Sequence, residues 1–198
     1  PVLLCNYVDV YKNERIDSGI EFMAATASPE QIRRLTLEVD DVIITKDSED
    51  PRDIGVPALV SEIVPNLVCG YHLALLRPRA NKNGGYIYYL FKSRYVAAAF
   101  ETEATGMTRY ALGKYSIENL DVPLPSEEEQ QTIAAFLDRE TGKIDALVAE
   151  QEKLIALLKE KRQAVISHAV TKGLPSTSSG QASAAKMKDS GIEWLGEV

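Results

Sequence analysis

Few side chains in this sequence could carry catalysis, because it contains only two histidines and two cysteines. His72 lies in an apolar run that we expect to be a strand, where a histidine is far more often satisfied in the core or at an edge than catalytic. His168 falls in the last turns of an expected helix, where the helix dipole favours a cation. Cys5 and Cys69 are far apart and form no Cys-x-x-Cys pair, which favours a reducing cytoplasm over a disulfide scaffold or a zinc site.

Four carboxylates crowd one polar loop. A nuclease-like metal site would need a downstream Glu-x-Lys on a strand, which the sequence lacks, so a solvated, self-paired loop is the simpler interpretation. The sequence also has no Gly-rich phosphate loop and no dinucleotide fingerprint, since Gly84-Gly85 alone is too weak a signal. We therefore expect no catalytic residue, no metal and no cofactor in this chain, and no self-sufficient enzyme. The carboxylates, Asp47, Glu49, Asp50 and Asp53, stand beside Lys46 and Arg52.

Binding remains as a function, and the charge pattern indicates where. The chain has a net charge of -7, yet residues 77–115 hold 7 Lys and Arg against 2 Asp and Glu. These cations alternate with tyrosines, and Lys and Arg hold phosphates while their hydrogen-bond donors can read base edges. Such a stretch is also an ordinary helix surface, so both interpretations stay open. The cations are Arg77, Arg79, Lys82, Lys92, Arg94, Arg109 and Lys114.

Residues 1–125 predict an α+β domain with a mostly antiparallel sheet and short helices at one side. The β-branched run at 42–45 is typical of a buried strand. Ser28, with Pro29 behind it and Gln31 three residues on, is a helix start. We expect strands at 3–10, 42–45, 56–64 and 67–76, a hairpin-like turn at Pro65-Asn66, helices at 28–35 and 86–100, and loops at 46–55 and 104–110.

Residues 126–172 predict one long, coiled-coil-forming helix with a weak joint at Thr141-Gly142. Ser126 and Glu129 form a capping box, and Gly173 and Pro175 follow the last turn. Residues 143–172 would span about 45 Å, which exceeds a small domain, so we expect this spacer helix to pair with another helix. The alternative is a helix folded back on its own domain. The heptad positions are Ile144, Val148, Ile155, Leu158, Val165 and Ala169, with Gln151 and Arg162 as polar members.

The remaining C-terminal residues predict two further segments. Residues 173–186 are small and polar, which is typical of a flexible linker. Residues 187–198 regain Ile192, Trp194 and Leu195 and look like the start of a further element. The sequence holds no apolar run of transmembrane length, so we expect no membrane partner.

Several motifs along the chain resemble parts of one known family. Three of them are Pro123-Leu124-Pro125, Glu129-Gln130-Gln131 and Phe136-Leu137-Asp138. They are similar to the end of a target recognition domain and the helix that follows it in the specificity subunits of type I restriction–modification systems. The resemblance continues through the helix in Lys143-Ile144-Asp145-Ala146-Leu147 and 157–164. Upstream, three more motifs resemble parts of the family's recognition domains: Lys46-Asp47-Ser48-Glu49, Gly70-Tyr71-His72-Leu73 and Gly106-Met107-Thr108-Arg109-Tyr110. Residues 187–197 resemble the segment that opens each half of such a subunit.

The resemblance implies non-catalytic, sequence-specific binding of double-stranded DNA by half a subunit, which reads one half-site and docks modification subunits. Restriction subunits would be further partners, and S-adenosylmethionine, ATP and magnesium would belong to partner subunits. The missing helix partner could be a second copy, giving a homodimer. Base-reading candidates are Lys46, Asp47, Ser48, Glu49, Gly106, Met107, Thr108, Arg109 and Tyr110; phosphate candidates are Lys12, Arg77, Arg79 and Lys92.

Three alternatives stay open beside this interpretation. Residues 46–48 would be a self-satisfied polar loop if they touch no DNA. Residues 106–109 would be a plain helix-terminating turn. The whole chain could instead be a coiled-coil adaptor that binds only protein and shows no salt-dependent binding to duplex DNA.

Overall fold

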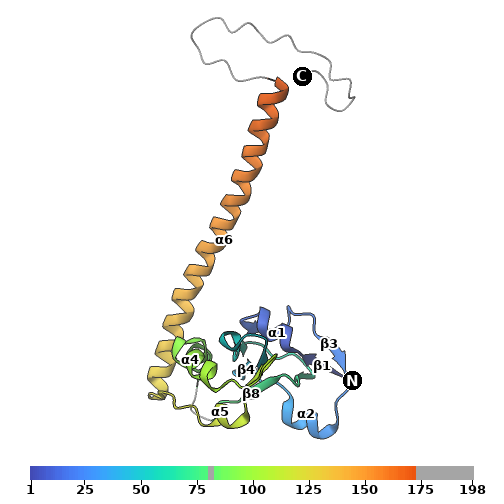
Figure 1. Ribbon diagram of the computed structural model, residues 1–198, viewed down its shortest axis with the longest axis vertical. Coiled ribbons are helices and arrows are strands. Elements are labelled where there is room, and N and C mark those ends of the chain that lie inside the picture. The colour runs from blue at the N-terminus through green and yellow to red at the C-terminus, as the bar shows by residue number, and fades with distance from the viewer. Residues whose placement is uncertain (80–82, 173–198) are drawn as a thin grey trace, which may run out of the picture. The chain divides into compact units, whose positions relative to one another are not determined.

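The computed structural model describes residues 1–79 and 83–172, so the predicted segments 173–186 and 187–198 lie outside the described residues. The chain divides into two compact units, Pro1–Arg139 and Glu140–Val198. The first unit combines small sheets with short helices, and the long helix α6 follows (Figure 1). The predicted α+β fold with a long helix is confirmed. The helices of the first unit are α1 (Tyr7–Lys12), α2 (Pro29–Leu35), α3 (Gly84–Lys92), α4 (Arg94–Glu103), α5 (Lys114–Glu118) and the 3-10 helix η1 (Pro51–Asp53).

Three small sheets make up the β structure of the first unit. Among the described residues β1–β7 and β2–β6 run parallel and the other pairs are antiparallel, so the mostly antiparallel prediction is confirmed. The sheets are β3-β1-β7, β2-β6-β4-β8 and β5-β9. Their strands are β1 (Val2–Cys5), β2 (Arg15–Ile16), β3 (Met23–Ala25), β4 (Val42–Thr45), β5 (Asp47–Ser48), β6 (Pro57–Val60), β7 (Leu67–Cys69), β8 (Leu73–Leu76) and β9 (Tyr110–Ala111).

Strand β4 lies between two hydrophobic clusters, which explains its unbroken apolar run. Ile43 packs in one cluster with Cys5 and Leu67, and Ile44 packs in the other with Tyr88 and Phe100. Figure 1 shows β4 and β8 between α4 on one side and β1 with β3 on the other. A strand covered on both faces has no polar side to alternate with, so all four of its residues are buried.

The predicted strand at 3–10 is half wrong, because β1 ends at Cys5 and a helix follows. The Asn6 side chain accepts from the N–H groups of Val8 (2.9 Å) and Asp9 (3.2 Å), and Asp9 accepts from the Asn6 N–H (2.8 Å). This capping box satisfies the first turn of α1 and outweighs the β propensity of the apolar residues around it. The capping box predicted at Ser28 is present in α2.

The predicted strand at 67–76 is two strands in different sheets, and β6 and β7 form no hairpin. The chain turns at Gly70, where an added Cβ would stand 2.5 Å from the Cys5 carbonyl oxygen, so only glycine fits this close approach. Similarly, the predicted helix at 86–100 breaks at Ser93. That residue is extended and its Oγ accepts from the Val96 N–H, so Ser93 ends α3 and caps α4.

The helix α6 (Glu127–Lys172) begins where predicted. Ser126 Oγ accepts from the Glu129 N–H (3.4 Å) and the Glu129 carboxylate accepts from the Ser126 N–H (3.0 Å). The helix continues through Gly142, so the expected weak joint does not break it. From Glu140 onward the described part of the second unit is this helix alone.

Candidate nucleic-acid interface

The two loops predicted to read bases are neighbours in space. Asp47 pairs with Ala111 and Ser48 with Tyr110 in the two-stranded β5–β9 sheet. The Leu112 N–H also donates to the Lys46 carbonyl oxygen (2.8 Å). Segments that stand about 60 residues apart in the sequence therefore form one surface.

The 106–110 segment forms the tip of a hairpin and is not the helix-terminating turn that was the alternative. Thr105 and Ala111 exchange backbone hydrogen bonds of 3.2 and 2.9 Å across its base. Gly106 has φ of +150° and lies so close to the returning chain that a Cβ there would come within 2.0 Å of the Arg109 carbonyl oxygen. Met107 is 94% exposed, and Thr108 and Arg109 are exposed beside it. The tip presents an apolar group, a hydroxyl and a guanidinium to solvent.

The 46–50 segment is partly self-satisfied. Ser48 is buried, and its Oγ accepts from the Asp50 N–H (3.2 Å). Asp47 bonds His72, and Lys46 stacks its ammonium over the Tyr71 ring at 5.6 Å from the centroid. Glu49 is exposed. The polar-loop alternative therefore fits Ser48, whereas Glu49 faces solvent.

A hollow between α1, η1 and the two loops adds residues that the sequence did not single out. The Tyr7 and Tyr11 rings stack at 5.6 Å between centroids. Burial raises the pKa of Tyr7 while a hydrogen bond with Ser48 opposes it, and the hydrogen bond to Asp53 raises the pKa of Tyr11. The i, i+4 spacing of the tyrosines was the available signal. The hollow is lined by Tyr7, Tyr11, Ser48, Glu49, Asp50, Asp53 and Arg109.

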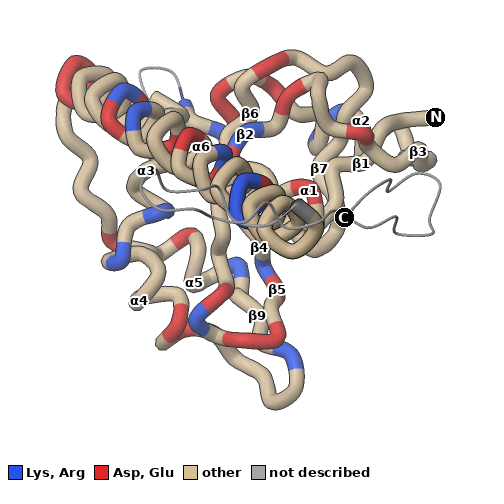
Figure 2. Tube along the Cα trace, turned by 90° about the horizontal axis from the view of Figure 1, so that it is seen from above, with Lys and Arg blue, Asp and Glu red and all other residues tan. Residues whose placement is uncertain are grey.

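The hollow is lined by charges of both signs. Figure 2 shows acidic and basic residues along the chain near β5 and β9. Arg52 bonds Asp50 through Nε (3.0 Å) and Nη2 (2.7 Å), and this side-chain pairing lowers the pKa of Asp50 to about 2. Carboxylates repel phosphates, but they accept hydrogen bonds from the amino groups of cytosine and adenine. The lining of the hollow therefore favours hydrogen-bond donors over phosphate groups.

The four phosphate candidates separate into two kinds. Arg77 bonds buried Asp41 through Nε (2.8 Å) and Nη2 (2.7 Å), and it also pairs with Glu38 (2.8 Å). Lys92 bonds Glu14 and lies over the Tyr88 ring. These contacts give Arg77 and Lys92 structural roles. Lys12 and Arg79 are exposed.

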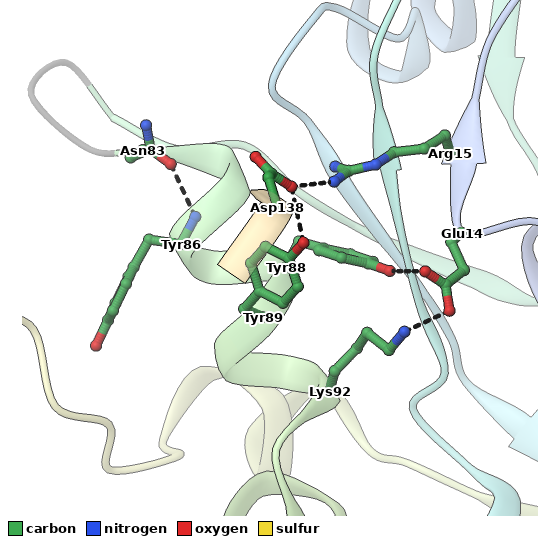
Figure 3. Close-up of polar contacts among 8 residues, drawn as sticks. All are labelled: Glu14, Arg15, Asn83, Tyr86, Tyr88, Tyr89, Lys92 and Asp138. Atoms are coloured by element: carbon green, nitrogen blue, oxygen red, sulfur yellow. Dashed lines mark hydrogen bonds and ion pairs between the residues drawn. The ribbon is translucent and has the colours of Figure 1, made fainter. Parts of the chain in front are cut away.

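A polar cluster holds the start of α6, which belongs to the first unit, against β2 and α3 (Figure 3). Asp138 accepts from Arg15 (2.6 Å) and from the Tyr89 hydroxyl (2.7 Å), while the Tyr88 hydroxyl donates to Glu14 (2.8 Å). The hydrogen bond from Lys92 holds the pKa of Glu14 below its ordinary value. These contacts join Asp138, near the start of α6, to Arg15 of β2 and Tyr89 of α3.

Gln130, the middle residue of the Glu129-Gln130-Gln131 motif at the start of α6, has a structural role. It is fully buried, its Nε2 donates to the Pro125 carbonyl (2.8 Å), and its Oε1 accepts from the Asn83 N–H (3.3 Å). Asn83 in turn caps α3 by accepting from the Tyr86 N–H (2.8 Å), as Figure 3 shows. A shorter or apolar side chain at Gln130 would leave the partly buried Asn83 N–H and Pro125 carbonyl without this partner.

The heptad positions of α6 are open to solvent. Ile144, Val148, Ile155, Leu158 and Val165 are each between 50% and 59% exposed, and Ala169 is half-buried. An apolar stripe of this length is typical of a helix that pairs with another apolar surface.

The part of the chain that the structure describes shows neither a metal-binding cluster nor a membrane-spanning helix. Within residues 1–79 and 83–172, no group of three or more His, Cys, Asp or Glu could hold a metal ion. No helix within those ranges has both the length and the apolar character needed to cross a membrane.

Comparison with known proteins identifies the family. The family model described as the type I restriction modification DNA specificity domain matches residues 10–157, and the chain belongs to this family. The chain is 28% identical over 135 residues to the type I restriction enzyme StySPI specificity subunit of Salmonella potsdam, covering 67% of this chain and 28% of that protein. It is 28% identical over 134 residues to the EcoKI specificity subunit of Escherichia coli K12, covering 66% and 28%. The chain thus spans less than a third of these curated relatives.

Solved structures agree with the fold. One chain from a study of complex assembly and conformational transition of the type I R-M system aligns with a TM-score of 0.55 at 28% identity, over 70% of this chain and 32% of that one. The HsdS subunit from Thermoanaerobacter tengcongensis aligns with a TM-score of 0.55 at 18% identity, over 81% and 40%. The second likeness supports the fold.

Proposed function

We propose that this chain recognises one half-site of a two-part DNA target and catalyses no reaction itself. The observation that carries the proposal is the β5–β9 pairing, which joins residues 46–50 and 106–110 into one surface. The membership of the specificity family supports the same function. In this account the double-stranded DNA lies against the hairpin tip and the neighbouring hollow.

Each part of this surface offers a different base-reading group. Arg109 can fork onto the O6 and N7 acceptors of guanine, and Thr108 can donate or accept. Glu49 and Asp47 can accept from the amino groups of cytosine or adenine. Exposed Lys12 and Arg79 would hold phosphates. Arg77 and Lys92 are left out because each is already paired with a carboxylate, Arg77 with buried Asp41 and Lys92 with Glu14.

The assembly in which this chain would act follows from its charge. With a net charge of -7, the chain holds DNA weakly by electrostatics alone, so we propose that modification subunits clamp it onto the duplex. Those subunits and the restriction subunits would supply S-adenosylmethionine, ATP and magnesium chemistry in the cytoplasm. A gel shift with and without the modification subunit tests this step, and equal affinity in both would contradict it.

The long helix would serve as a spacer that pairs with a second helix. Its exposed heptad positions support this role. The second helix would come from another half of a longer subunit or from a second copy of this chain, and the two helices would set the distance between two half-sites.

Selection from a library of randomised duplexes tests the proposed function. We expect one short motif to be enriched by the chain together with its modification subunit, and its affinity to fall steeply between 50 and 200 mM salt (on the order of 10³-fold for about six phosphate contacts). A protein-only adaptor would enrich no motif and show no salt-dependent binding. That result would reject DNA recognition and favour the coiled-coil adaptor.

A further inference from the structure

The turn between β7 and β8 contacts the 46–50 segment at several points. Predicted to lie inside a strand, His72 instead stands in this turn, and its carbonyl oxygen accepts from the Lys46 N–H (2.9 Å). Its Nδ1 bonds the Asp47 Oδ2 atom. Tyr71, which is 86% exposed, meets the His72 ring edge-on at 4.9 Å and lies under the Lys46 ammonium. Both residues of the turn thus hold neighbouring residues of a predicted base-reading segment.

The hydrogen bond between His72 and Asp47 has a defined direction. An ionised carboxylate only accepts, so the imidazole carries its proton on Nδ1 and donates it to Oδ2. The Asp47 side chain is 19% exposed and that of His72 is 44% exposed, so the pair sits at the surface with the carboxylate partly covered. The hydrogen bond to Oδ2 restricts the rotation of the carboxylate, and the lone pairs of Oδ1 can accept from a base amino group.

We propose that His72 is a positioning residue for base recognition: it holds the Asp47 carboxylate in the orientation that reads an amino group of cytosine or adenine. The contact between the Lys46 ammonium and the Tyr71 ring restricts the same segment at the neighbouring residue. The inference rests on the proposed function, since it assigns a third segment to the DNA-reading surface. Neither loop predicted from the sequence contains these two residues.

Two nearly isosteric variants test this role in the duplex selection described above. In His72→Asn the amide nitrogen takes the place of Nδ1 and can still donate to Asp47, whereas in His72→Gln it takes the place of Nε2 and points elsewhere. We expect His72→Gln to lose about tenfold of the preference at one base position, and His72→Asn to retain it. His168→Ala, a change of the other histidine, is the control and should leave the motif unchanged.

A pair of further variants connects the effect to Asp47. Asp47→Ala should relax the same base position as His72→Gln, and the double variant should relax it no further than either change alone. The inference is overturned if His72→Gln keeps the full preference, if the two single variants relax different positions, or if His72→Asn and His72→Gln lose binding to all duplexes alike. If the unchanged chain enriches no motif at all, the proposed function itself fails, which is a distinguishable result.

Discussion

At the scale of single residues, two arginines from one basic stretch of the sequence have different roles. Arg77 neutralises buried Asp41, which is 1% exposed, whereas Arg109 extends from a hairpin tip into solvent. Both belong to the same basic stretch, and the sequence predicted DNA contacts for each. The carboxylates at 38 and 41 that engage Arg77 lie far from it in the sequence, so no local pattern separated the two cases.

Arg77→Ala should therefore reduce the free energy of unfolding. Removing the guanidinium leaves the buried Asp41 carboxylate without its charged partner, which we expect to cost about 2–3 kcal/mol. Denaturant unfolding measures the change. Arg79→Ala is the matched control, since Arg79 is exposed, and it should stay within about 0.5 kcal/mol of the unchanged protein. Equal stability of the two variants would contradict the structural role of Arg77.

At the scale of elements, sequence signals predicted the helix starts and the strand that depend on interactions between neighbouring residues. The capping boxes at Ser28 and Ser126 set the starts of α2 and α6, and the β-branched run at 42–45 marked β4. The Asn6 box was missed because the residues around it have high β propensity. The β5–β9 pairing could not be predicted, because strands of two residues carry no periodic pattern and their register comes from tertiary contacts.

Gly106→Ala should disturb the hairpin tip with little effect on the domain core. The new Cβ would stand 2.0 Å from the Arg109 carbonyl, so the tip must change its path and Arg109 its position. We expect the selected DNA motif to be lost while most of the thermal stability remains. Gly142→Ala makes the same chemical change where nothing lies within 4 Å, and should preserve the motif and stabilise α6 by about 1 kcal/mol. A preserved motif in Gly106→Ala would argue against the tip as a reading element.

At the scale of the whole molecule, the apolar stripe on α6 is exposed to solvent within the described residues. The same stripe was visible in the sequence as a heptad pattern, since periodicity depends only on the helix itself. The helix that pairs with this stripe could not be predicted, because a heptad pattern describes only the apolar face of its own helix.

We expect the chain to form a dimer through this stripe when no other helix is supplied. Size-exclusion chromatography with light scattering should give twice the mass of 21.8 kDa at high concentration. Leu158→Lys places a cation in the stripe and should shift the population to monomer, whereas Ala156→Lys, on the opposite side of the helix, should not. A monomer at every concentration would contradict pairing between two copies.

The central claim is that the surface joined by β5 and β9 reads DNA bases. Sequencing the methylated positions in the genome of a host that carries the intact system, with either Arg109 or Arg109→Ala, tests it most directly. We expect a two-part motif in which the variant relaxes one base position of one half, with a loss of about 1–3 kcal/mol in binding, and leaves the spacing unchanged. An identical motif in the variant, or an equal loss of methylation at all sites, would contradict the claim.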